Sequence, residues 1–311
     1  MLQSTRASWS DARQLTAQLN RWAKGQQWPQ SLQMLRELHE NAQEANVIHL
    51  SCVLSALTER WILALELLEE MMQDDCEPDT ICFNATICAC ENCGQLQAVL
   101  QLMQLMDDLQ VPKSIVTFSS AISACGMTWQ LALHLLWAGP RNTVSYSAAI
   151  SSCEKAGNWS VMLLLLENML RETLRPNVVT LSACVACCEK GREWRRALEV
   201  LRQMERMQVT ANSISYNSAI SACERGSQLS IALDLMKEME QREIGKDVVT
   251  YGAAIFCCEQ SGQWRCAQQL LEDMARLRIE KNVVTANAAI STFGVARKWQ
   301  LALYLLKAGE E

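Results

Sequence analysis

The sequence predicts an all-α fold, an α-solenoid built from helix-turn-helix repeats of about 35 residues. Two observations predict it. Four cysteines recur at intervals of 35 residues: Cys153, Cys188, Cys223 and Cys258. A fixed period of roughly 20–50 residues is the signature of a repeat array. Each period also holds two amphipathic segments, and neither can bury its apolar stripe unless neighbouring units stack.

Residues 143–177 show what one unit contains. The first half places apolar residues at helical spacing: Tyr146, Ala149, Ile150 and Cys153. Gly157 then ends the helix, because glycine takes the positive φ common after a helix C-terminus without a Cβ clash. The second half repeats the spacing: Trp159, Met162, Leu163 and Leu166. One unit is therefore a helical hairpin, and Pro176 and Asn177 close it.

The rest of the chain divides in the same way. Residues 1–10 form a short polar lead, and nine units follow: 11–46, 47–79, 80–114, 115–142, 143–177, 178–212, 213–247, 248–282 and 283–311. The first unit is degenerate and aligns through Gly25 and Trp28. The fourth is short, and the ninth is partial because it stops inside its second helix. A solenoid normally ends in a polar cap, so we expect the chain to be truncated or to continue.

Composition narrows the class of protein. Half of the 311 residues are hydrophobic and the net charge is −6, which is unusual for a nucleic-acid binder. No run of 18 uncharged apolar residues occurs, so we expect no membrane span. The first residues lack the apolar core of a secretion signal, and no targeting peptide is visible.

The 15 cysteines invite a disulfide or metal interpretation. Six of them share one place in their units: Cys90, Cys125, Cys153, Cys188, Cys223 and Cys258. Packing explains this register, because a free cysteine behaves as a small hydrophobe at a helix–helix contact. The alternative is a metal site at Cys88, Cys90 and Cys93, but a zinc site needs convergent ligands and these lie around one helix. We expect no metal and no cofactor, and a reducing compartment.

Four second helices begin with a similar sequence that opens on tryptophan, at Trp61, Trp129, Trp194 and Trp299. Each begins a stripe of Ala and Leu at helical spacing. Base stacking is one interpretation of these rings, and we favour core packing because the rest of the stripe is apolar.

The unit boundaries carry a family resemblance. They read PNVVT at 176–180, KDVVT at 246–250 and KNVVT at 281–285, followed by stretches such as SYNSAISACERG and TYGAAIFCCEQSG. With the 35-residue period and the closing Pro-Asn, the chain resembles the pentatricopeptide repeat family from residue 11 to 311. The resemblance implies a right-handed superhelix of helical hairpins that holds single-stranded RNA, with one repeat for each base.

The resemblance also implies which side chains read the bases. These are the fifth and the last residue of each unit, which we call a base-reading pair. The pairs are Ser51 with Asp79, Asn84 with Ser114, Ser119 with Asn142, Ser147 with Asn177, Ser182 with Asn212, Asn217 with Asp247, and Gly252 with Asn282. Asn287 opens a further pair, and Leu15 leaves the first unit without one. The alternative for the last residues is helix N-capping, and one residue can have both roles.

Family resemblance assigns a base to most pairs. In order from the second unit, it implies guanine, a pyrimidine, three adenines, uracil and one unread base at Gly252. Asp accepts hydrogen bonds and cannot donate, so Asn217 with Asp247 favours a base that offers an N–H, as uracil does.

Two further sets of residues complete the expected site. The second residue of each unit is aliphatic, and the resemblance implies that these residues flank the bases: Ile81, Val116, Val144, Val179, Ile214, Val249 and Val284, with Ile48 in the same place. The alternative is ordinary core. The thirteenth residue is basic in three units: Lys155, Lys190 and Arg225. We expect these to meet phosphates, or alternatively to form a solvated face, because a glutamate precedes each.

The sequence thus predicts a sequence-specific single-stranded RNA-binding protein that acts in organelle RNA processing, stability or translation, in a chloroplast or mitochondrion as the resemblance implies. It would act by occupying RNA and not by catalysis, because no deaminase motif, carboxylate pair or phosphate-binding glycine loop occurs. The alternatives are a protein-binding α-solenoid scaffold, which the acidic balance favours, and a decayed array without a ligand.

Overall fold

The computed structural model describes residues 17–19, 21–22, 25, 27–40, 47–73 and 76–307. Helices are the only regular elements within these ranges, so the all-α prediction is confirmed there. None of the described helices has both the length and the apolar character that crossing a membrane requires. The lead at 1–10 and part of unit 11–46, including Leu15, lie outside the described residues.

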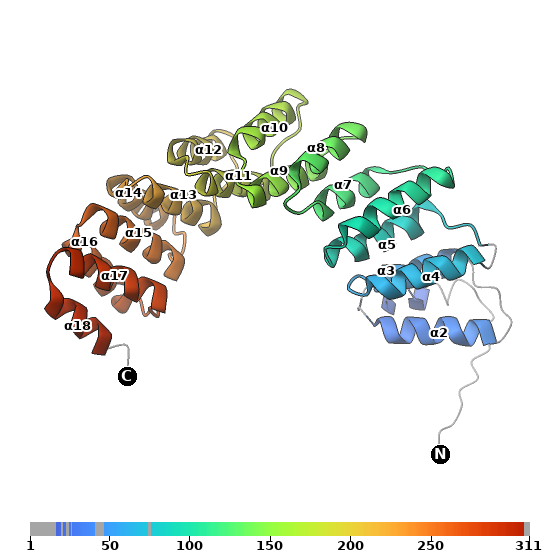
Figure 1. Cartoon of the computed structure of the whole chain (residues 1–311), viewed down its shortest axis with the longest axis horizontal. Helices are drawn as coiled ribbons and strands as arrows, with labels where there is room; N and C mark the ends of the chain where they lie inside the picture. The colour runs from blue at the N-terminus through green and yellow to red at the C-terminus, as the bar shows by residue number, and fades with distance from the viewer. Residues whose placement is uncertain are drawn as a thin grey trace, which may run out of the picture. The chain divides into compact units, whose positions relative to one another are not determined.

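The chain forms two compact units, residues 1–149 and 150–311, and the boundary falls within α9 (Thr143–Ala156). The first unit contains α2 (Trp28–Glu40), α3 (Val47–Ala56), α4 (Trp61–Gln73), α5 (Thr80–Asn92), α6 (Leu96–Asp108), α7 (Ile115–Ala124), α8 (Trp129–Ala138) and the start of α9. Consecutive helices form antiparallel hairpins, as Figure 1 shows for α5 and α6.

The second unit continues with α10 (Trp159–Arg171), α11 (Val178–Lys190), α12 (Trp194–Arg206), α13 (Ser213–Arg225), α14 (Leu229–Gln241), α15 (Val248–Ser261), α16 (Trp264–Arg276), α17 (Val283–Val295) and α18 (Trp299–Lys307). First helices pack on first helices, as in the series α11, α13, α15 and α17. Second helices also contact the first helix of the next hairpin, as α12 contacts α13 and α14 contacts α15. This is the repeat stacking of an α-solenoid.

The core lies between the two helices of a hairpin, and between that hairpin and the next one. In α13 the buried face is the one that the periodicity predicts: Tyr216, Ala219, Ile220 and Cys223, all fully buried. On α14 it is met by Ala232, Leu235, Met236 and Met239. Because successive hairpins of the second unit repeat this arrangement, its core runs from hairpin to hairpin and does not gather at one centre.

The cysteines behave as packing residues. The six that share one register are buried, and every cysteine of the described ranges is a free thiol. Burial raises the pKa of Cys153 and Cys223 to about 11, so these thiols stay protonated at neutral pH. Within those ranges no group of three possible ligands, including Cys88, Cys90 and Cys93, could hold a metal ion.

The tryptophans correct the core-packing expectation. Those at 61, 129, 159, 194 and 264 are only half-buried, and Trp299 is 63% exposed. The rings of Trp159 and Trp194 lie against the turn of the following hairpin, at Gly191 and Gly226. A Cβ added at Gly191 would lie 2.5 Å from Cδ1 of Trp159, so glycine is needed for this contact. Trp159 and Trp194 therefore join neighbouring hairpins.

Candidate nucleic-acid interface

From unit 47–79 to unit 248–282, the last residue of each unit caps the next first helix. Six of these residues have extended φ and ψ, and the side chain of each accepts a hydrogen bond from a backbone N–H of the first turn. Asn212 accepts from the N–H of Ser215 at 3.0 Å, and Asp247 from that of Thr250 at 2.9 Å. The same bond is made by Asp79, Ser114, Asn142, Asn177 and Asn282. The capping interpretation is therefore correct, and it leaves part of each side chain free for another partner.

The fifth residues lie one turn into the first helices. Ser51, Ser119, Ser182, Asn217 and Gly252 are buried. Asn84 and Ser147 are half-buried, and Asn287 is exposed. A small polar side chain at such a depth needs hydrogen-bond partners, because an unpaired buried polar group costs about 1–3 kcal/mol.

In three of the expected pairs the two members bond directly. The amide Nδ2 of Asn84 donates to Oγ of Ser114 at 3.1 Å. The hydroxyl of Ser182 donates to Oδ1 of Asn212 at 3.4 Å. These residues are 30 positions apart, so the stacking of hairpins brings them together.

The third direct contact joins Asn217 and Asp247. Nδ2 of the amide donates to both carboxylate oxygens, at 3.1 and 3.2 Å. Burial tends to raise the pKa of Asp247, but the hydrogen bonds from Thr250, Asn217 and the Val249 amide outweigh it and lower that pKa. Asp247 is therefore ionised at neutral pH and can only accept.

Two other expected pairs, Ser51 with Asp79 and Ser119 with Asn142, are not joined. The hydroxyl of Ser51 donates to the carbonyl of Ile48, and that of Ser119 donates to the carbonyl of Ile115 at 2.5 Å. Both bonds stay within the serine's own helix. In the part of the chain that the structure describes, no hydrogen bond links Ser51 to Asp79 or Ser119 to Asn142.

A third residue joins the bonded pairs, and the sequence analysis missed it. It is the third residue of the following unit: Thr117 beside Asn84, Ser215 beside Ser182, and Thr250 beside Asn217. The available signal was the Thr or Ser that recurs at this place in the VVT boundaries. A small side chain that forms part of a capping box is easily assigned to capping alone.

The aliphatic second residues are solvent-exposed. All eight, Ile48, Ile81, Val116, Val144, Val179, Ile214, Val249 and Val284, expose between 53% and 68% of their surface. The core alternative for this position is therefore wrong. Each exposed side chain stands on a first helix, three residues before the fifth residue of its unit.

The basic thirteenth residues are also exposed, with glutamates close to them. Nζ of Lys190 pairs with Oε1 of Glu154 at 2.9 Å. Burial raises the pKa of Glu189, against the effect of Arg225 and of a hydrogen bond from Ser218. The basic row thus runs beside a half-buried acidic row, which partly neutralises it.

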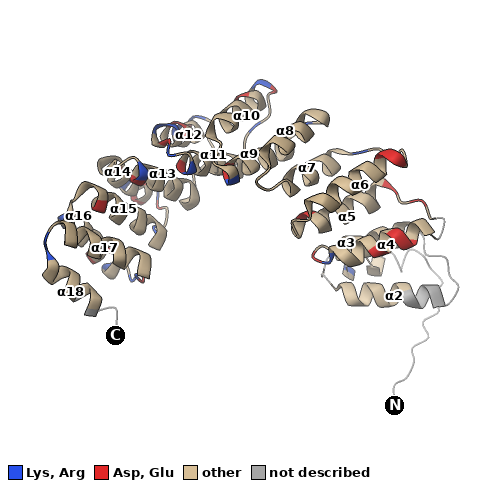
Figure 2. Ribbon diagram, viewed as in Figure 1, with Lys and Arg blue, Asp and Glu red and all other residues tan. Residues whose placement is uncertain are grey.

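Charge is unevenly divided along the chain. Residues 1–149 contain 8 Lys and Arg against 15 Asp and Glu, whereas residues 150–311 contain 20 against 19. Figure 2 shows acidic segments on α4 and at the end of α6. A polyanion would therefore meet less repulsion at the second unit than at the first.

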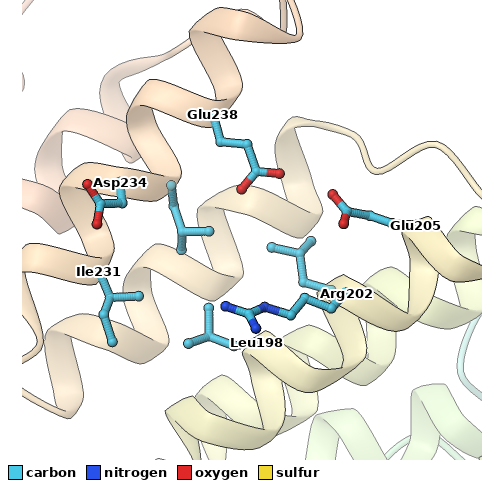
Figure 3. A pocket seen from close by; sticks show the side chains of 8 residues that line it. Leu198, Arg202, Glu205, Ile231, Asp234 and Glu238 are labelled. Atoms are coloured by element: carbon cyan, nitrogen blue, oxygen red, sulfur yellow. The ribbon is translucent and has the colours of Figure 1, made fainter.

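A shallow pocket lies between two second helices, α12 and α14 (Figure 3). Its apolar lining includes Leu198 and Ile231, and Arg202, Glu205, Asp234 and Glu238 also line it. Glu205 and Glu238 both pair with Arg242, which lies just after α14. The pocket is formed by second helices, so it is separate from the base-reading pairs.

Comparison with known families gives matches along most of the chain. A family model described as "Pentatricopeptide repeat domain" matches residues 35–128, 164–225 and 234–304. A second, described as "PPR repeat", matches 144–174 and 214–244. No curated protein sequence matches the chain significantly.

Among solved structures, two of the pentatricopeptide repeat protein PPR10 in complex with an 18-nucleotide psaJ RNA element are similar to this chain. One of the two carries three Cys-to-Ser substitutions. Each has a TM-score of 0.64 and 17% identity, over 95% of this chain and 50% of the other. The structure of PPR10 from maize has a TM-score of 0.44 at 18% identity, over 91% and 52%. The chain thus spans about half the length of the proteins it matches, and the likeness shows the fold.

Proposed function

Because this chain belongs to the pentatricopeptide repeat family, we propose that it is a sequence-specific single-stranded RNA-binding protein that reads one base with each repeat. In this proposal it acts by occupying RNA, in organelle RNA processing, stability or translation, and has no catalytic role. The similar PPR10 structures, solved with an RNA element, support RNA as the ligand class.

The observation that carries the proposal is the coincidence of two features on the first helices. Polar pairs bond across adjacent hairpins, and exposed aliphatic residues stand one turn away from them. An unstacked base has a polar edge and two apolar faces. The pairs suit the edge, and the aliphatic residues suit the faces. Without such a ligand, the row of exposed aliphatic side chains would keep apolar surface in contact with water, which is unfavourable in free energy.

The Asn217–Asp247 pair illustrates the chemistry. The Asn217 amide uses one of its two N–H groups on Asp247 and keeps one for a ligand. Asp247 accepts two backbone N–H bonds from the first turn of α15 and has further lone pairs. The pair therefore offers a donor beside an acceptor. The Watson–Crick edge of uracil, with an N–H beside a carbonyl, complements it.

Binding assays with matched RNAs test the proposal. The chain is titrated with an RNA that contains the implied order, guanine, pyrimidine, three adenines and uracil, and with a scrambled RNA, at two salt concentrations. We expect tighter binding to the first RNA, and affinity for it that falls as salt rises. Equal and weak binding of both RNAs would overturn the proposal.

A double substitution tests the one-base rule. Asn217→Ser with Asp247→Asn converts this pair to the Ser–Asn type, and Asn is as good an N-cap as Asp, so folding should be kept. We expect the preference to change from uracil to adenine at one base and at no other. A change at every base, or at none, would contradict one-repeat, one-base reading.

The α12–α14 pocket favours a second candidate, a protein-binding scaffold. Its apolar lining and charged rim are of the kind that a partner side chain could fill. Substitution of Ile231 with Asp should abolish binding of a protein partner and leave RNA binding unchanged. The scaffold becomes the better account if neither RNA is bound.

A further inference from the structure

We propose that the hydroxyl group of Thr250 sets the base preference of the Asn217–Asp247 pair by holding the Asn217 amide in one orientation, and that Thr117 does the same for Asn84. This inference rests on the proposed RNA binding. In both places the threonine is a positioning residue: it acts on the base through the asparagine and need not touch the RNA.

The contact itself is short and buried. Oγ1 of Thr250 donates to Oδ1 of Asn217 at 2.6 Å, and Thr250 is fully buried while Asn217 is 9% exposed. At the other pair, Oγ1 of Thr117 donates to Oδ1 of Asn84, also at 2.6 Å. A separation of 2.6 Å suits an O–H···O bond and is shorter than usual for N–H···O, so the carbonyl end of each amide faces the hydroxyl.

A backbone N–H occupies one acceptor site of each threonine hydroxyl and leaves its hydrogen available to donate. The N–H of Asp247 donates to Oγ1 of Thr250 at 3.1 Å, and the N–H of Ser114 donates to Oγ1 of Thr117 at 3.0 Å. Each hydroxyl thus receives one hydrogen bond from the cap residue. We assign its own hydrogen to the asparagine because this is the nearer acceptor: from Oγ1 of Thr250, Oδ1 of Asn217 lies at 2.6 Å and Oδ1 of Asp247 at 2.9 Å. We call this series of two hydrogen bonds, from the backbone N–H to the threonine hydroxyl and from that hydroxyl to the asparagine carbonyl, the relay.

The amide NH₂ group is then directed towards the last residue of the pair. At Asn217 the carboxylate of Asp247 reinforces this orientation, because a carboxylate accepts only. At Asn84 the partner is Ser114, whose hydroxyl could bond to either end of an amide, so only Thr117 distinguishes the two orientations. Without the relay, the amide could present either a donor or an acceptor to the base.

The serine pair lacks this relay. The hydroxyls of Ser182 and Ser215 are 2.8 Å apart, and either can be the donor. The partner of Ser215 is itself a hydroxyl, which rotates freely between donor and acceptor directions. Ser182 therefore has no amide group with two different ends that a hydrogen bond could hold in one orientation. The effect is therefore confined to the two asparagine pairs.

The chain supplies a matched control at Thr285. This residue is buried and makes the same capping box with Asn282, whose N–H donates to Oγ1 of Thr285 at 3.1 Å. The fifth residue beside it is Gly252, which has no amide to orient. Replacing Thr285 therefore removes the capping contribution of the hydroxyl and nothing else that the proposal invokes.

The experiment measures the binding of four RNAs that differ only in the base opposite the Asn217–Asp247 pair. Thr250→Val removes the hydroxyl at constant shape, Thr250→Ser keeps it, and Thr285→Val is the control. We expect Thr250→Val to lower the preference for uracil over the other bases about tenfold. Thr250→Ser and Thr285→Val should keep the preference within about twofold of the unmodified chain. Thermal melting curves recorded in parallel report the folding of each variant.

Two results would overturn the inference, and they are distinguishable. If Thr250→Val weakens all four RNAs equally, the hydroxyl has only a structural role, and RNA reading itself still holds. If the unmodified chain does not discriminate among the four RNAs, the proposed function fails and the inference fails with it. Should Thr250→Val not fold, Thr117→Val and Thr117→Ser apply the same test at Asn84.

Discussion

The indole of Trp194 rests on Gly226 of the following hairpin. A Cβ added at Gly226 would lie 2.4 Å from Cδ1 of the indole, closer than any real van der Waals contact. The glycine has no positive φ, so the space for the ring, and not backbone freedom, explains why glycine is needed here. Neighbouring hairpins depend on this contact for their spacing.

Gly226→Ala should therefore lower the free energy of unfolding by about 1–3 kcal/mol, because the added methyl group overpacks the contact with Trp194. Chemical denaturation measures this. Gly294→Ala is the control, since a Cβ at this α17 position meets nothing within 4 Å and should raise stability by up to about 1 kcal/mol. Equal effects of the two substitutions would contradict the packing argument.

Thr173 adopts a left-handed backbone conformation, with φ of 58°, at the end of α10. A β-branched residue is strained there. Thr173→Gly should raise the free energy of unfolding by about 1 kcal/mol, measured by urea denaturation. Gly157→Ala, at φ of 69°, should lower it by a similar amount. No gain in the first variant would show that the surrounding turn compensates for the strain.

Ile214 is 60% exposed and Ile220, on the same helix, is fully buried. Ile214→Ala should change the free energy of unfolding by less than about 0.5 kcal/mol, whereas Ile220→Ala should lower it by about 2–5 kcal/mol. If Ile214 covers a base, its substitution should still weaken RNA binding several-fold. Unchanged RNA affinity in the folded Ile214→Ala variant would remove this residue from the site.

Glu224 is half-buried, and burial raises its pKa above the ordinary value of 4.5; Arg225 opposes the rise and Glu189 and Glu259 add to it. The native state therefore holds this proton more tightly than the unfolded chain. Stability falls as pH rises from 4.5 through the native pKa. Glu224→Gln should raise the melting temperature at pH 7, with a gain that shrinks as pH approaches 4.5.

The control for this prediction is Glu280→Gln, at an exposed position, which should change the melting temperature little at either pH. Melting curves across the pH range compare the two variants. A gain from Glu224→Gln that does not depend on pH would mean that titration of the carboxyl group has no part in the effect.

The sequence by itself determined the hairpin period and the buried faces. Tyr216, Ala219, Ile220 and Cys223 follow the 3.6-residue period, which is a local property of a helix. The capping residues could also be found, because a side chain that closes its own first turn acts over three residues. The last residue of a unit is Asn, Asp or Ser, and these residue types suit both an N-cap and a base-reading pair. The sequence alone therefore left both roles open.

Only the tertiary structure decided which side chains meet across hairpins. The bond between Asn217 and Asp247, the relay through Thr250 and the contact of Trp194 with Gly226 each join residues of adjacent hairpins. It also decided that the aliphatic second residues are exposed, although their composition suits a core. The physical reason is that one helix has several apolar positions, and the packing of the next hairpin determines which of them are covered.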